Sequence, residues 1–105
     1  MSTARYVLEG RTPIECPDTA AWQEWLRSAD RHVAVTCISS QGVLITISSE
    51  FVGVDSSGSS IRRPRLFLTR VFGGPLAGRT WHGPTSKAAI RHHAAAMAGV
   101  ITTLL

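Results

Sequence analysis

Residues 31–54, RHVAVTCISSQGVLITISSEFVGV, decide the fold class of this chain. Apolar and polar residues alternate through 31–38 and again through 43–54, and a period of two is typical of strands with one buried face. The residues between them, 39–42, are the turn-forming SSQG. We therefore predict a β-hairpin within an antiparallel sheet. The shared faces predicted for its two strands are Val33, Val35 and Cys37, and Val43, Ile45, Ile47 and Phe51.

Three further segments are predicted to be extended. Residues 5–9 form a first strand, and LFLTRVF at 66–72 is the most β-prone run, placed at or near the centre of the sheet. A short strand is expected at 79–82. Residues 11–18, RTPIECPD, contain two prolines and are predicted to be an extended connection.

Two helices complete the predicted fold. The first begins at Asp18 or Thr19, and its apolar residues recur at helical spacing. They are Trp22, Trp25, Leu26 and Ala29. The second begins at Thr85 or Ser86 and runs close to residue 105 with one apolar stripe, expected to face the core. This stripe is Ile90, Ala94, Met97, Ile101 and Leu104.

These elements predict an α+β fold, with an antiparallel sheet of about four to five strands and two helices packed on one face. A length of 105 residues with 44% hydrophobic content fits a single compact domain over 1–105. Residues 55–64 contain serine, glycine and arginine and are expected to be a flexible loop. The predicted core is Trp22, Trp25, Val33, Ile47, Phe67, Val71, Met97 and Ile101.

Charge is unevenly distributed along the chain. All seven acidic residues lie in 1–55, whereas residues 56–105 hold seven basic residues and no acid. The second half is therefore predicted to present an anion-facing surface. The candidate binding residues are Arg62, Arg63, Arg65, Arg70, Arg79 and Trp81. The alternative for the arginines at 62–65 is a solvated segment that only keeps the protein soluble, and for Trp81 a place at the edge of the core.

Arg70 interrupts the apolar strand at 66–72. Either its face of the sheet is partly exposed, or the side chain reaches a carboxylate such as Glu50.

No motif for catalysis, a cofactor or a metal emerges from the sequence. His92 and His93 are adjacent, whereas two ligands of one metal on a helix stand four residues apart, so His93 is expected to be packed in the core. The chain contains neither a nucleophile elbow nor the lysine of a phosphate-binding loop. We therefore expect no enzymatic activity, no cofactor and no metal.

Two cysteines are too few for a disulfide framework, and the N-terminal residues have no apolar signal segment. We therefore expect a cytoplasmic protein that does not enter a membrane. The sequence leaves its oligomeric state open.

Three motifs between residues 22 and 74 resemble those of a family of small proteins found in bacteriophages and prophages, and the resemblance covers nearly the whole chain. They are Trp22-x-x-Trp25-x-x-x-Ala29-Asp30-Arg31-x-Val33-Ala34, Ile47-Ser48-Ser49-x-Phe51-Val52-Gly53-Val54-Asp55 and Pro64-x-x-Phe67-x-Thr69-x-Val71-Phe72-Gly73-Gly74. The resemblance implies a phage or prophage origin and location in a host bacterial cell. It implies no particular activity.

The chain departs from the family pattern at polar positions. Ser56 replaces a histidine of the family, and Leu68 and Arg70 replace a glutamate and a methionine. A polar site built from the family's Asp, His and Glu would therefore lack two members here.

These observations lead to two functional hypotheses. The first is a non-catalytic, phage-derived interaction protein that binds and inhibits a host component through an acidic surface of that partner, as anti-CRISPR proteins do. The second is a nucleic-acid-binding accessory protein that uses the basic second half.

Overall fold

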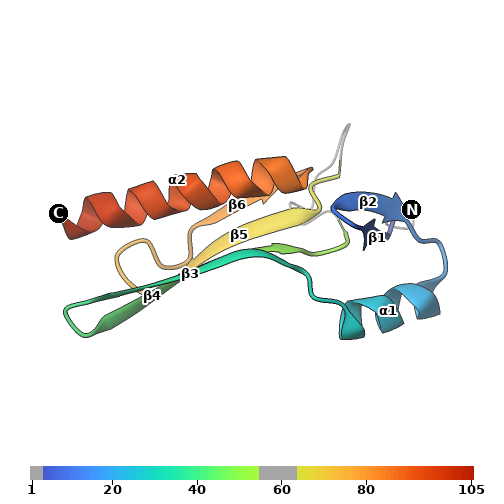
Figure 1. Cartoon of the computed structure of the whole chain (residues 1–105), viewed down its shortest axis with the longest axis horizontal. Helices are drawn as coiled ribbons and strands as arrows, with labels where there is room; N and C mark the ends of the chain where they lie inside the picture. Colours follow the sequence, from blue (N-terminus) through green and yellow to red (C-terminus); the bar gives the residue numbers. More distant parts are fainter. Residues whose placement is uncertain (1–3, 55–63) are drawn as a thin grey trace.

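Two antiparallel sheets and two helices make up the fold (Figure 1). The structure is a computed structural model that describes residues 4–54 and 64–105. Its elements are β1 (Tyr6–Glu9), β2 (Thr12–Glu15), α1 (Thr19–Ser28), β3 (His32–Ser40), β4 (Val43–Phe51), β5 (Phe67–Phe72), β6 (Thr80–Gly83) and α2 (Ser86–Leu104). The predicted α+β fold is confirmed.

The larger sheet is a four-stranded meander in the order β3-β4-β5-β6. The predicted hairpin is its first half, with Ser40 paired to Val43. The turn is shorter than expected, because it consists only of Gln41 and Gly42, both with positive φ. Two consecutive turn residues with left-handed backbone conformation match the right-handed twist of the strands that a tight hairpin joins.

A β-bulge corrects the predicted faces of β3. The pairing register shifts between His32 and Ala34. From that point Thr36 and Ile38 face α2, whereas Val35 and Cys37 are exposed on the opposite side of the sheet. The predicted face of Val33, Val35 and Cys37 was wrong because alternation in the sequence does not reveal an inserted residue.

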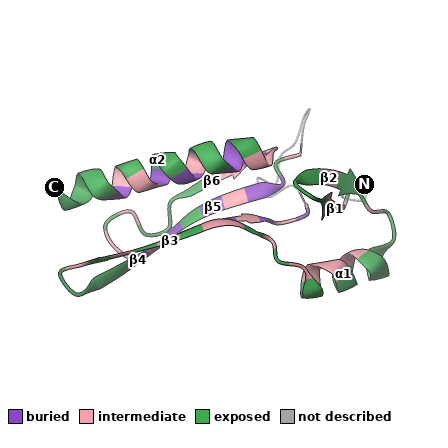
Figure 2. Cartoon of the chain, viewed as in Figure 1, coloured by how far each residue is buried: buried purple, intermediate pink, exposed green. Residues whose placement is uncertain are grey.

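Helix α2 covers one face of the larger sheet, and the buried part of the helix faces the sheet (Figure 2). The buried positions are Ala88, Ala89, His93, Ala96 and Val100. The predicted stripe was wrong: Ile90 and Ile101 are each 46% exposed, and Met97 is half-buried. Small side chains allow the helix axis to approach the sheet closely, so the larger residues are displaced to its flank. None of the helices in the described ranges has the length and hydropathy to cross a bilayer.

Residues 4–31, which include β1, β2 and α1, lie beyond one end of the larger sheet (Figure 1). Residues predicted as a connection pair instead as β2 with β1. Helix α1 packs on β1, with Asp18 capping its first turn. Trp22 Nε1 donates to Tyr6 O at 3.0 Å, and Trp25 meets Phe51 edge to face at 5.6 Å. Both tryptophans are half-buried. Of the two helices α1 and α2, only α2 lies over the four-stranded sheet.

The core consists of two clusters between the sheet and α2. One contains Ile45, Ile47, Val71, Ala96 and Val100, and the other Phe51, Leu66, Phe67 and Ala89. The predicted burial of Ile47, Phe67 and Val71 is confirmed. Val33 is half-buried against the second cluster.

Candidate binding surface

The predicted binding residues do not form one patch. Arg62 and Arg63 lie outside the described residues, as does the predicted loop apart from Pro64. Arg65 is exposed just before β5. Arg70 and Thr80 are paired in the sheet and share one face, whereas Trp81 pairs with the buried Thr69 and faces α2. The structure therefore separates Arg70 from Trp81 by the thickness of the sheet.

Arg79 and Trp81 form a unit at the β6 edge. The Arg79 guanidinium lies 5.5 Å from the centroid of the Trp81 ring, and Trp81 is half-buried against the Ile45 cluster. This geometry fits the alternative that places Trp81 at the edge of the core, with Arg79 stacked outside it.

The sheet face opposite α2 is the candidate surface, and we call it the open face. Its members on β3, β4 and β5 include Val35, Cys37, Leu44, Thr46, Ser48, Glu50, Leu68, Arg70 and Phe72, and Thr80 of β6 shares the face. Three apolar side chains on it are strongly exposed: Leu44 by 62%, Val35 by 52% and Phe72 by 48%. Antiparallel sheets commonly leave one face in water, but that face then carries polar residues. Exposed apolar residues from three adjacent strands are instead typical of a contact surface.

Arg70 and Phe72 form the polar and aromatic centre of the open face. The Arg70 guanidinium lies 5.7 Å from the centroid of the Phe72 ring. A shallow depression beside them is lined by Ser48, Glu50 and Leu68. Arg70 is exposed and forms no ion pair with any described carboxylate, including Glu50 on the neighbouring strand. Of the two placements predicted for Arg70, the structure therefore has the exposed face.

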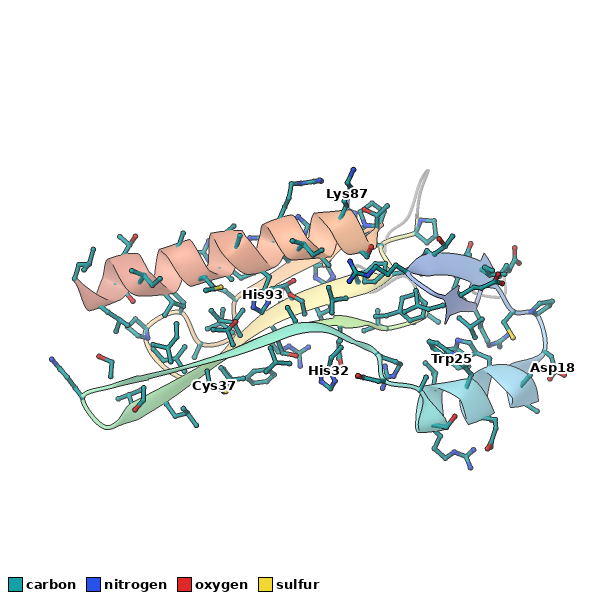
Figure 3. The ribbon with its side chains drawn as sticks, viewed as in Figure 1. Asp18, Trp25, His32, Cys37, Lys87 and His93 are labelled. Carbon is teal, nitrogen blue, oxygen red and sulfur yellow. The ribbon has the colours of Figure 1, made fainter. Side chains whose placement is uncertain are left out.

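A buried polar network lies on the other face, between the sheet and α2. His93 Nδ1 lies 2.9 Å from Ser49 Oγ, and its Nε2 lies 2.9 Å from Thr36 Oγ1. Ser49 Oγ is also 2.7 Å from Thr69 Oγ1. Figure 3 shows His93 between α2 and the sheet. Burial lowers the pKa of His93, so the ring is held neutral.

This network is structural. Ser49 and Thr69 are completely buried, and a nucleophile there would be out of reach of any substrate. The prediction that His93 is a core histidine is confirmed. The sequence contained a signal for the network that went unused: serine and threonine at inward positions of two apolar strands need partners.

A second hollow lies where the turn between β1 and β2 meets the starts of β3 and α2. It measures about 240 Å³, its charged lining is Arg11, Asp30 and Arg31, and the His32 ring lies beside them. Arg31 Nη1 donates to Phe51 O at 3.0 Å, which ties the guanidinium to the backbone. Hydrogen bonds from the His32 backbone and ring lower the pKa of Asp30. Across the described ranges, no group of three or more metal-ligating side chains assembles.

Comparisons with protein-family models, curated proteins and solved structures give no match for this chain. The resemblance to phage proteins therefore stays a prediction, and the functional argument rests on the geometry of the open face.

Proposed function

We propose that this protein is a non-catalytic interaction protein that binds a partner protein through the open face of its four-stranded sheet. The observation that carries the proposal is the exposure of Val35, Leu44 and Phe72 on the sheet face that also carries Arg70. Protein interfaces combine an apolar centre with aromatic and arginine residues that contribute most of the binding energy. The open face has this composition.

The charges on the open face favour a partner with an acidic group. Arg70 has no carboxylate partner among the described residues, so a partner carboxylate would satisfy it without breaking an existing ion pair. Its planar guanidinium can donate two parallel hydrogen bonds to one carboxylate. Arg65 before β5 and Arg79 at the β6 edge are exposed and add positive charge outside the open face, and Arg62 and Arg63 remain sequence-based predictions for the same contact.

The phage resemblance supports a host protein complex as the partner. A small protein that acts by occupying a surface inhibits its partner by excluding the partner's normal ligand, and anti-CRISPR proteins of phages act against host defence complexes in this general manner. We propose inhibition of a host component as the outcome of binding, in the cytoplasm of the host cell.

Nucleic acid is the second candidate, and one observation favours it. An exposed aromatic ring beside an arginine on a central strand is suited to stack a base of a single strand. Against this, Arg70 is the only arginine or lysine among the defined members of the open face, and it shares that face with Glu50 and the aliphatic Val35 and Leu44. Phosphate contacts need several cations, so a protein partner fits this face better.

The experiment compares wild-type protein with Arg70→Glu and Phe72→Ser, each immobilised and exposed to nuclease-treated lysate of a host bacterium. A specific partner, once identified by mass spectrometry and purified, is titrated by calorimetry. We expect each variant to weaken binding by at least tenfold, since both residues are exposed and central. Arg91→Glu is the matched control, because Arg91 is exposed on α2 away from the open face.

Direct nucleic-acid binding is measured with a labelled single-stranded 20-mer at about 50 and 200 mM salt. The proposal expects weak binding that is not altered by Phe72→Ser. Tight binding that falls steeply with salt and is lost in Phe72→Ser would replace the protein partner by nucleic acid. A partner that binds both open-face variants as well as wild type would place the interface elsewhere.

A further inference from the structure

One edge of the larger sheet is left with unused backbone groups. Val52 N donates to Leu66 O at 2.7 Å. In β4, the backbone N–H and C=O groups of even-numbered residues therefore point toward β5, and those of odd-numbered residues point toward β3. Those odd residues pair with Thr36 and Ile38, whose backbone groups therefore point inward. The N–H and C=O groups of the intervening residues, Val35, Cys37 and Ser39, point away from the sheet. No group in the described residues pairs with them.

The two edges of the sheet are treated differently by the sequence. Strand β6 is four residues long, follows Arg79 and ends before Pro84, and a short strand bounded by charge and proline is a poor template for further pairing. Strand β3 is nine residues long and contains no proline, lysine, arginine or acidic residue. A long, uncharged edge strand pairs readily with another strand.

The flank of α2 above β3 is apolar as well. Met97 Sδ lies 3.8 Å from Thr36 Oγ1, so this side of the helix overhangs β3. Ile90 lines the hollow beside His32 and Val33, and Leu104 lines a depression with Ser40. Ile101 belongs to the same flank and, like Ile90, is 46% exposed. The apolar stripe seen in the sequence therefore borders the unpaired edge.

We propose that a second copy of this chain binds here, with β3 of the two copies paired antiparallel about a two-fold axis. Only an antiparallel pairing of a strand with itself is compatible with that symmetry. The register that uses all the outward groups places Cys37 opposite Cys37 of the second copy, with Val35 opposite Ser39. The result is one continuous eight-stranded sheet, over which the two α2 helices bring their half-exposed stripes together.

A second copy is the occupant that satisfies both observations. An added strand from an unrelated protein would pair with the backbone edge but would leave Ile90 and Ile101 in water. The dimer covers both features with surfaces already present in the chain, and its open faces remain available for the partner proposed above.

The test measures the molar mass of the full chain by light scattering between about 10 and 200 μM. The expected mass is twice the 11.3 kDa of one chain. Cys37→Pro removes an outward N–H and leaves the bonds to β4 intact, so we expect a monomer. Cys37→Ser retains the N–H and should stay dimeric.

Two further measurements keep the proposal testable if Cys37→Pro fails to fold. In a Cys16→Ser background, a short bis-maleimide should join two chains through Cys37, which is exposed (Figure 3). Ile101→Glu should raise the dimer dissociation constant by at least tenfold, whereas Ala95→Glu, on the solvent side of α2, should not. A monomeric wild type over the whole concentration range, or a dimer unaffected by both Cys37→Pro and Ile101→Glu, would overturn the proposal.

Discussion

Removing one hydroxyl at Ser49 tests how much the buried polar network contributes to stability. Ser49→Ala changes the side-chain volume very little, yet it removes the group that joins Thr69 and His93. The variant leaves the Thr69 hydroxyl and His93 Nδ1 without a partner, and Thr69 is 1% exposed. The cost is therefore dominated by lost hydrogen bonds and desolvated polar atoms.

The magnitude follows from the two bonds. Each neutral hydrogen bond contributes roughly 0.5–1.5 kcal/mol, and leaving a buried partner unsatisfied raises the cost toward about 1–3 kcal/mol. We expect Ser49→Ala to lower the free energy of unfolding by about 2–4 kcal/mol. For a domain of this size, whose total stability is about 5–15 kcal/mol, that is a large fraction.

Urea denaturation followed by circular dichroism measures the effect. With a denaturant slope of about 1–3 kcal/mol/M, the midpoint should fall by roughly 0.7–4 M. Ser48→Ala is the matched control, because Ser48 is the neighbouring residue on the open face, and it should change stability by less than about 0.5 kcal/mol. Equal small losses in both variants would refute the conclusion that the network stabilises the fold.

The remaining predictions concern the pH dependence of stability and the substitution of glycines at positive φ. Burial lowers the pKa of His93, and burial with the charges of Arg91 and His82 lowers that of His92, so the unfolded chain binds protons more readily than the folded one. The free energy of unfolding should be highest above about pH 6.5 and should fall as the pH drops below that value. The urea midpoint of His93→Gln should depend less on pH than that of the wild type. Gly73→Ala should cost at least about 2 kcal/mol, because Gly73 has φ of 80° and a Cβ would strike Leu44 O. Gly10→Ala, also at positive φ but in open space, is the control and should cost only about 1 kcal/mol; equal thermal shifts in the two glycine variants would contradict the argument.

Local sequence patterns were sufficient for all the described elements except β2 and insufficient for the faces of β3 and α2. The hairpin, the β5 strand and the caps at Asp18 and Thr85 follow from alternation, turn residues and side-chain oxygens. The face of β3 depends on a bulge that shifts the register by one residue, and nothing in 31–38 marks it. Strand β2 was missed because Pro13 argues against a strand, although an edge position accepts it.

The face of α2 was predicted wrongly for a different reason. Periodicity identifies a stripe of large apolar residues but does not say whether a sheet accepts their bulk. Here alanines and His93 meet the sheet, and the stripe that includes Ile101 lies beside the contact. For the candidate site, the exposure of Arg70 was one of two predicted outcomes, whereas the cluster of Val35, Leu44 and Phe72 needed the strand order.

The meander has a consequence for how the molecule opens. Strands β3 to β6 and α2 are consecutive elements and contact one another directly. Residues 4–31 meet this unit where Tyr6, Leu8 and Trp25 reach the Phe51 cluster and through backbone hydrogen bonds to Phe51 and Gly53. Residues so attached can detach in a local fluctuation that costs less than global unfolding. Backbone amides of β1 and α1 would then exchange with solvent earlier than those of β4 and β5, while the open face and the β3 edge persist as one cooperative unit.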